Sequence, residues 1–255
     1  MNYFKIDAER MLFSPRFWGA VLFVPCILLA GIMEDVSLES DVCGIVAIVM
    51  YSIPSVLILL CGSFAFADSF CEDIEHKYMM QQILRGGIKQ YVAARLINIF
   101  LGAMAVTALG LLLYACILRI WFPWNGVSDI YEEWLVAGRF AGLLRHQHYV
   151  LYFLMYGIQY GALVGVLALW SAYISLFAPN RMLVWSFPVI GFYFLDNLYS
   201  TLFPGNAAIN LLFTLSFNAF KNDWMEMVVI VSISLVHIIL LYGLVIRRIR
   251  RRYYE

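Results

Sequence analysis

Long apolar stretches alternate with short polar connections along this chain of 255 residues. The stretches with no charged side chain, or only one, are Phe17–Met33, Gly44–Ala67, Leu96–Leu118, Tyr149–Ala178, Met182–Phe220 and Met227–Ile246. A helix needs roughly 20 apolar residues to cross the hydrocarbon core of a bilayer, which is about 30 Å thick. The stretch that begins at Met182 contains Asp196 and is long enough for one span, Met182–Leu202, and a further irregular segment. The pattern therefore predicts an all-α membrane protein with six transmembrane helices.

The composition agrees with this prediction. Hydrophobic residues make up 63% of the chain and charged residues only 13%, whereas soluble domains are about 25% charged. A soluble protein of this length would have to bury all six stretches, and its few charges could not cover such a core. The formal net charge is zero, and we expect no nucleic-acid partner.

Lys and Arg are concentrated in alternate connections, which predicts the orientation of the chain. On one side are Lys5, Arg10 and Arg16 before the first stretch, Lys77, Arg85, Lys89 and Arg95 after the second, Arg181 after the fourth, and Arg247, Arg248, Arg250, Arg251 and Arg252 after the last. The other side has Arg119, Arg139, Arg145 and Lys221 among more numerous acids. Because cytoplasmic connections carry an excess of Lys and Arg, we expect both termini to be cytoplasmic.

The cysteines and the first residues suggest no further chemistry. Cys26, Cys61 and Cys116 lie within apolar stretches, and Cys43 and Cys71 fall on opposite sides of the membrane in this topology. We therefore expect neither a disulfide framework nor a metal site. Residues 1–13 mix acids with bases, so we expect no signal peptide.

Residues 1–15 predict a short amphipathic helix. Phe4, Ala8, Met11 and Leu12 fall on one side, and Lys5, Asp7, Glu9 and Arg10 fall largely on the other. A helix of this kind lies flat at the membrane interface. Ser14-Pro15 should end it, because the residue before proline avoids the helical conformation. The alternative is a frayed tail.

The connection between the second and third stretches predicts a cytoplasmic helix over about residues 70–85. Ser69 and Glu72 have the spacing of a capping box, and Asp73 and Lys77 have the spacing of an i,i+4 ion pair. Gly86-Gly87 is a helix stop. The helix would carry a partly apolar surface, formed by Ile74, Tyr78, Met79, Ile83 and Leu84. It packs either on a partner or on its own bundle and lipid.

Two segments resemble the six-helix permeases of ABC-type exporters, the bacterial type 2 drug, peptide and polysaccharide export class. Glu9–Trp18 (ERMLFSPRFW) is similar to the segment that leads into their first span, and Glu75–Arg95 is similar to their loop between spans two and three. Two departures are Gly86-Gly87, where Thr-Pro is usual, and Ala94, where Gly is usual.

The resemblance implies that residues 70–85 form a coupling helix, seated on a separate ATPase subunit. The residues that it assigns to this contact are Asp73, Ile74, Glu75, Tyr78, Gln82, Ile83, Leu84 and Lys89. It also implies a second permease copy or a related permease, membrane lipid around the bundle, and a bacterial plasma membrane. The chain has no Gly-x-x-x-x-Gly-Lys-Ser/Thr run, which cradles nucleotide phosphates. We therefore expect no catalytic residue and no cofactor here, with ATP and Mg bound by the partner ATPase.

Two segments are predicted to lie outside the membrane. Residues 121–149 are expected to form an outer amphipathic helix, with Ile130, Trp134, Leu135, Phe140 and Leu143 as its apolar members. For residues 203–220 the resemblance implies short outer re-entrant helices between spans five and six, and a seventh span is the alternative.

Polar groups within spans are costly and often functional. Asp196, Asn197, Gln159 and His237 are therefore the candidates for a substrate pathway. The alternative is a structural role, in which such a residue lies near the membrane interface or pairs with a neighbouring helix.

Two other classes of protein remain open. Glu132-Glu133, with Arg139, His146 and His148, is similar to the paired glutamates and histidines of CAAX-type intramembrane proteases. Five residues rather than three separate the pair from the arginine, and the set falls in an outer loop. A non-transporting membrane immunity or sensor protein is the third class.

Overall fold

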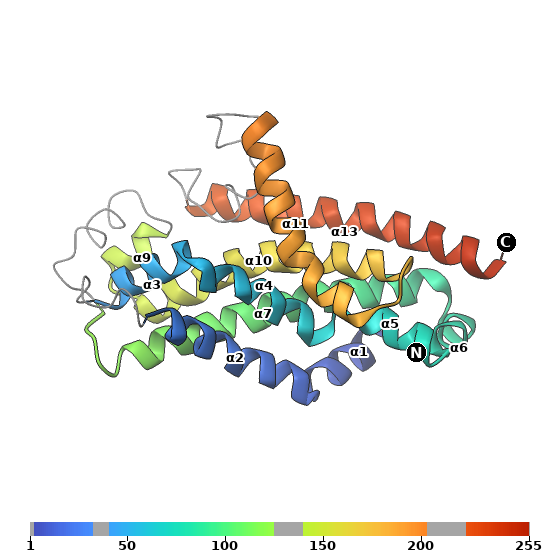
Figure 1. Cartoon of the computed structure of the whole chain (residues 1–255), viewed down its shortest axis with the longest axis horizontal. Coiled ribbons are helices and arrows are strands. Elements are labelled where there is room, and N and C mark those ends of the chain that lie inside the picture. The colour runs from blue at the N-terminus through green and yellow to red at the C-terminus, as the bar shows by residue number, and fades with distance from the viewer. Residues whose placement is uncertain (1–2, 33–40, 125–139, 203–222, 255) are drawn as a thin grey trace.

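The computed structural model describes residues 3–32, 41–124, 140–202 and 223–254, and this part of the chain contains helices and no strand (Figure 1). The helices are α1 (Tyr3–Leu12), α2 (Pro15–Ile32), α3 (Val42–Tyr51), α4 (Ile53–Phe66), α5 (Ser69–Glu75), α6 (Tyr78–Gly86), α7 (Ile88–Leu118), α9 (Ala141–Arg145), α10 (Tyr149–Ser175), α11 (Arg181–Leu202) and α13 (Asp223–Tyr254). The prediction of an all-helical protein is confirmed for these residues.

The centre of the bundle is the pair α7 and α10, which pack along most of their length. Gly157, Gly161 and Gly165 form a stripe of small residues on α10 that faces α7. A Cβ atom at Gly161 would lie 2.7 Å from the backbone oxygen of Met104, which is too close for a real contact. Small residues at this spacing let two helix backbones approach closely within a membrane. The stripe therefore holds the two helices together.

The other long helices surround this pair. α2 and α4 pack on α7, and α11 and α13 pack on α10. Figure 1 shows α13 lying along the bundle, whereas α11 leaves it at a steep angle. Only 22% of the apolar, membrane-length segment of α13 is buried against the rest of the chain. Most of its surface is therefore available to lipid or to another protein.

Several of these helices are suited to a membrane. The described residues contain four helices long and apolar enough to cross one, or five if α1 and α2, bent by 53°, count as one broken span. The four are Ile53–Glu75, which takes α4 and α5 together, Ile88–Leu118, which is α7, Tyr149–Ser175, which is α10, and Met227–Arg252 within α13. This observation rests on length and composition, and it indicates a membrane protein.

The predicted second span, Gly44–Ala67, is not one continuous helix. Ser52 has an extended backbone and separates α3 from α4, and its N–H donates to Val49 O at 3.2 Å. Pro54 occupies the first turn of α4, where its missing N–H costs nothing. The proline therefore starts a new helix at this point.

The bend between α1 and α2 falls at Ser14-Pro15 as predicted, but Asp7 does not share the exposure of Lys5, Glu9 and Arg10, with which it was grouped on the polar side of α1. Tyr3, Asp7 and Met11 are buried, whereas Phe4 is 43% exposed. Asp7 therefore points into the protein rather than toward the headgroup region. The reason is a long-range ion pair of Asp7 with Arg95 of α7.

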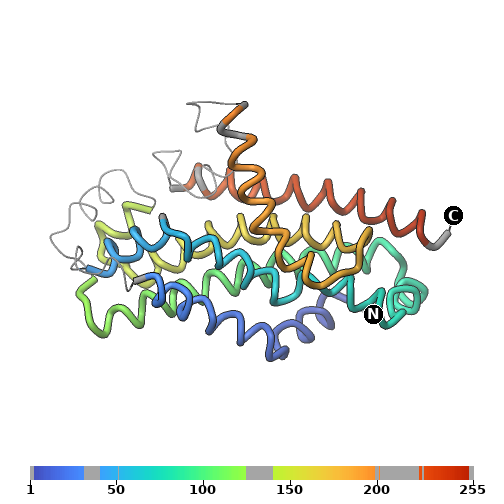
Figure 2. The backbone as a smooth tube through the Cα atoms, viewed as in Figure 1, coloured from blue at the N-terminus to red at the C-terminus, as the bar shows by residue number. Residues whose placement is uncertain are grey.

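The beginning and the end of the described chain lie at the same end of the bundle. Figure 2 shows the first turn of α1 and the last turns of α13 at the end that carries α5 and α6. Two hydrogen bonds fix this arrangement: the Tyr3 hydroxyl donates to Gln82 O at 2.8 Å, and Arg252 donates to Leu176 O at 3.2 Å. We call this the charged end.

Candidate functional site

The segment expected to form one helix over residues 70–85 is broken in two. α5 ends at Glu75, α6 begins at Tyr78, and Lys77 between them has a left-handed backbone with a φ of 58°. Gly87, with a φ of 82°, ends α6 as predicted. The prediction of a single continuous helix is therefore wrong, and the predicted helix stop at Gly86-Gly87 is confirmed.

The acids of α5 are bound to arginines rather than to their local partners. Arg10 donates to Glu72 at 2.6 Å, and Arg16 donates to the same carboxylate at 2.7 Å. α5 has no side-chain cap, so the predicted capping box of Ser69 and Glu72 is not formed. The predicted pair of Asp73 with Lys77 is also wrong, because Asp73 turns inward.

Arg95 of α7 is the centre of a buried ion network. Its side chain is fully buried and donates to Asp7 of α1 at 3.1 Å and to Asp73 of α5. The Tyr91 hydroxyl also donates to Asp73, at 2.6 Å. The rings of Tyr91 and Phe66 each lie 5.4 Å from the guanidinium carbon. One cation therefore joins three helices that are far apart in the sequence. We call Asp7, Asp73 and Arg95 the Arg95 cluster.

The charges of the Arg95 cluster depend on one another. Burial raises the pKa of the Asp7 carboxyl above its ordinary value, and the neighbouring Arg95 opposes this rise. Arg10 adds a second cation 3.6 Å from Asp73. A buried ion without its partner retains the full cost of leaving water. The cluster is therefore stable only as a set.

α6 is fixed to the same framework. The Tyr3 ring packs against Gly86, where a Cβ atom would lie 1.9 Å from Tyr3 Cε2. The Gln82 side chain lies 3.5 Å from Arg95 Nη2, and Met79 and Ile83 are buried. The inner side of α6 is therefore attached to α1 and α7.

The residues assigned to ATPase contact differ in exposure. Asp73 and Ile83 are buried, Ile74 and Gln82 are partly buried, and Glu75, Tyr78, Leu84 and Lys89 are exposed. Glu75 is paired with Arg181 of α11. Leu84 is 77% exposed and Tyr78 is 50% exposed. We call the exposed residues Lys77, Tyr78, Gln81, Leu84 and Arg85 the α6 surface.

The candidate pathway residues lie on three helices. Gln159 is buried within α10, whereas Asp196 and Asn197 are exposed on α11. His237 of α13 contacts Ile233 O through Nδ1 at 2.8 Å, and its ring lies 6.5 Å from that of Trp170. In the part of the chain that the structure describes, the four candidates are therefore divided among α10, α11 and α13, and they differ in exposure.

The features of the protease hypothesis lie mostly outside the described residues. Glu132, Glu133 and Arg139 lie outside the described residues. The predicted re-entrant segment, residues 203–220, also lies outside them. His146 and His148 are exposed at the far end of the bundle, with their rings 6.4 Å apart. The part of residues 121–149 that is described contains the short helix α9, with Phe140 and Leu144 buried. Among the described residues, no group of three or more His, Cys, Asp or Glu could hold a metal ion.

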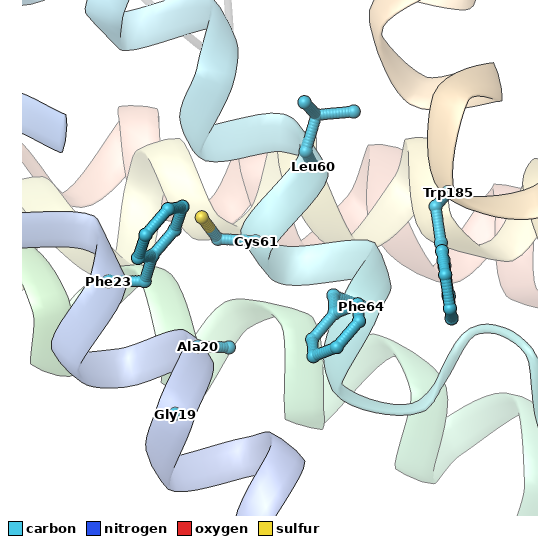
Figure 3. A pocket seen from close by; sticks show the side chains of 7 residues that line it. All are labelled: Gly19, Ala20, Phe23, Leu60, Cys61, Phe64 and Trp185. Carbon is cyan, nitrogen blue, oxygen red and sulfur yellow. The ribbon is translucent and has the colours of Figure 1, made fainter. Parts of the chain in front are cut away.

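A cavity of about 460 Å³ lies between α2, α4 and α11 (Figure 3). Its lining residues are Gly19, Ala20, Phe23, Leu60, Cys61, Phe64 and Trp185. None of them is among the candidate site residues predicted from the sequence, because the cavity is defined by the way three distant helices meet.

The Arg95 cluster was also missed, although the sequence has a signal for it. Arg95 stands at the start of an apolar stretch, and a cation entering a bilayer needs an acidic partner.

Comparison with protein-family models, curated proteins and solved structures finds no match to this chain.

Proposed function

We propose that this chain is the membrane-spanning permease subunit of an ABC-type exporter in a bacterial plasma membrane. In this proposal the chain has six spans and cytoplasmic termini, and it works with a second permease copy or a related permease. It moves a peptide, drug or lipid-like substrate outward by alternating access. A separate ATPase subunit binds ATP and Mg and supplies the energy, and this chain is not itself an enzyme.

The observation that carries the proposal is the α6 surface. An aliphatic side chain that is 77% exposed, Leu84, stands beside the bases Lys77 and Arg85 at the charged end of the bundle. Exposed apolar patches rimmed by polar residues mark sites of interaction with proteins or membranes. A helix at this end is also where the resemblance expects the ATPase to bind.

The attachment of α6 supports the proposal. A docking helix has to transmit the movement of the ATPase to the spans, so its inner side has to be held firmly. Tyr3, Gln82 and Ile83 hold α6 against α1 and α7, and the Arg95 cluster holds α5. A load on the α6 surface would therefore reach the start of α7, the longest of the central helices.

The experiment that tests the proposal is the variant Leu84→Asp. We expect the variant to insert normally and to lose its ATPase during co-purification, with affinity reduced at least about tenfold, because a buried carboxylate would replace an interface anchor. Ile120→Asp is the matched control, since Ile120 is 74% exposed and lies at the opposite end of α7. The control should retain the ATPase.

The outcome against the proposal is also defined. If Leu84→Asp and Ile120→Asp retain equal amounts of ATPase, α6 is not the docking surface. If the wild-type chain brings down no ATPase at all from its native membrane, the class of protein is wrong.

A further inference from the structure

Pro188 interrupts the backbone hydrogen bonds of α11. In an α-helix each backbone N–H donates to the carbonyl four residues earlier, and proline has no N–H. Pro188 lies inside α11, so it cannot donate to Val184 O. Val184 is fully buried, and a buried carbonyl without a donor is unfavourable. At this point α11 therefore needs a donor from outside the helix.

The Ser171 hydroxyl of α10 supplies this donor. It is buried and donates to Val184 O. Two other buried hydroxyls in apolar helices, those of Ser63 and Thr107, donate to the carbonyl four residues earlier in their own helix. Ser171 instead donates to a different helix. In membrane proteins the side chains of neighbouring helices commonly satisfy the backbone groups that a proline frees.

The part of α11 before Pro188, residues 181–187, is attached to the bundle at three points. Arg181 is paired with Glu75 of α5. The Trp185 ring lies 4.9 Å from the Phe64 ring of α4. The hydrogen bond from α10 is the third attachment. We call residues 181–187 the inner part of α11.

The part of α11 after Pro188 is less firmly held. Tyr193 is 53% exposed and Phe194 is 65% exposed, and Asp196 and Asn197 are exposed as well. Figure 1 shows this part leaving the bundle at a steep angle. We call residues 189–198 the outer part of α11. The packing of the described chain therefore resists a movement of the outer part less than a movement of the inner part.

A change of bend is easier at Pro188 than elsewhere in α11. Opening the helix at another position breaks backbone hydrogen bonds, and their groups find no substitute in lipid. At Pro188 one of these bonds is already absent. Val184 O retains its donor, Ser171, whatever the direction of the outer part. Prolines are accordingly common sites of helix kinks.

We propose that Pro188 is a hinge in α11. The hydrogen bond from Ser171 to Val184 O is the anchor that holds the inner part in place while the outer part moves relative to the bundle. Because the outer part carries Asp196 and Asn197, the hinge changes where these polar side chains lie. The proposal rests on α10 and α11 alone and does not depend on the ATPase partner.

The first test measures distances between pairs of spin labels by double electron–electron resonance, with the full chain in nanodiscs and the native cysteines replaced by alanine. One label is placed on α10 by Val150→Cys. The other is placed on the outer part by Phe194→Cys or on the inner part by Met182→Cys, and all three positions are more than half exposed. We expect the outer pair to have a distance distribution at least about twofold wider than the inner pair, because only the outer pair spans the hinge.

Pro188→Ala restores the missing donor in α11. The distribution of the outer pair should then narrow to the width of the inner pair, whose own width should not change. Ile190→Ala is the matched control, because Ile190 is 62% exposed in the same helix, and it should leave both widths unchanged. Equal widths of the two pairs before the substitution, or an unchanged outer pair in Pro188→Ala, would overturn the hinge.

The second test concerns the anchor and uses unfolding by SDS titration in mixed micelles. Ser171→Ala leaves Val184 O buried without its donor from α10, so the equilibrium constant for unfolding should rise by about fivefold to 150-fold. In the Pro188→Ala background the new N–H at position 188 donates to the same oxygen. Adding Ser171→Ala there should change the constant by less than about threefold.

Ser63→Ala is the control for this comparison, because the Ser63 hydroxyl donates within its own helix. Its effect should be the same with and without Pro188→Ala. An equal effect of Ser171→Ala in both backgrounds would show that the hydroxyl does not replace the donor that Pro188 lacks, and the proposed anchor would be wrong.

Discussion

Arg95 is a cation placed where an isolated charge would be very unfavourable. Its side chain is fully buried, and both of its acidic partners, Asp7 and Asp73, are buried as well. A buried pair is a weak source of stability compared with apolar packing, but breaking one is costly because the remaining charge has no water. The three residues therefore specify where α1 and α5 lie on α7.

The variant Arg95→Met tests this interpretation. It leaves two buried carboxylates without their cation, and we expect a loss of about 3–5 kcal/mol in the free energy of unfolding. The measurement is unfolding by SDS titration in mixed micelles, followed by helix content. Arg85→Met is the control, because Arg85 is exposed on α6, and it should stay within about 0.5 kcal/mol of the wild type.

Neutralising the acids should restore part of this loss. In the Arg95→Met background, Asp7→Asn with Asp73→Asn removes both stranded charges, so the triple variant should be more stable than Arg95→Met alone. An equal or lower stability of the triple variant would mean that Arg95 acts through packing and not through charge.

At the scale of the helix, α7 and α10 depend on the glycine stripe. Gly157, Gly161 and Gly165 stand on successive turns of α10, and a Cβ atom at any of them would come within 3.0 Å of α7. Apolar lipid gives no hydrophobic drive to helix association, so close packing of backbones contributes much of the stability. The first effect of a larger residue is to separate these helices.

We expect Gly161→Ala to destabilise the bundle by about 1–3 kcal/mol, the typical cost of overpacking. The same SDS titration measures it. Gly243→Ala adds the same methyl group to α13 where nothing lies within 4 Å, and it should be neutral. If both variants behave alike, the stripe does not determine the packing of α7 on α10.

At the scale of the whole molecule, the first turn of α1, the last turns of α13 and α6 share one end of the bundle. The distribution of Lys and Arg predicts that this end is cytoplasmic. An impermeant thiol reagent tests this orientation after the native cysteines have been replaced by alanine. Gln81→Cys, exposed on α6, should resist labelling in intact cells and label in inverted vesicles. Trp121→Cys, 66% exposed at the opposite end of α7, should give the reverse result. Labelling of Gln81→Cys from the medium would invert the topology.

Local patterns were sufficient to predict the long helices. Leu96–Leu118 lies within α7, and Tyr149–Ser175 accounts for nearly all of the fourth stretch. Breaks that depend on one residue were also readable, as at Pro15 and Gly87. The glycine stripe was present at intervals of four residues, although only the structure shows which helix it faces.

Long-range partners were not predictable from local spacing. Asp73 has a base four residues away in Lys77, yet it pairs with Arg95, 22 residues further along the chain. Asp7 was assigned to the polar side of α1, and it is buried because its partner Arg95 lies 88 residues further along the chain. The cavity beside Trp185 depends on three helices meeting, and no local sequence pattern encodes that arrangement.

The separation of Asp7 from Arg95 has a consequence for the growing polypeptide. A ribosome adds about 5–20 residues per second, so Arg95, the partner of Asp7, is synthesised roughly 4–18 s after Asp7. During that interval the first helix has been synthesised but has no anchor, and Asp73 emerges before its cation as well. The emergence of the start of α7 from the ribosome thus sets the time at which α1 can take its final position.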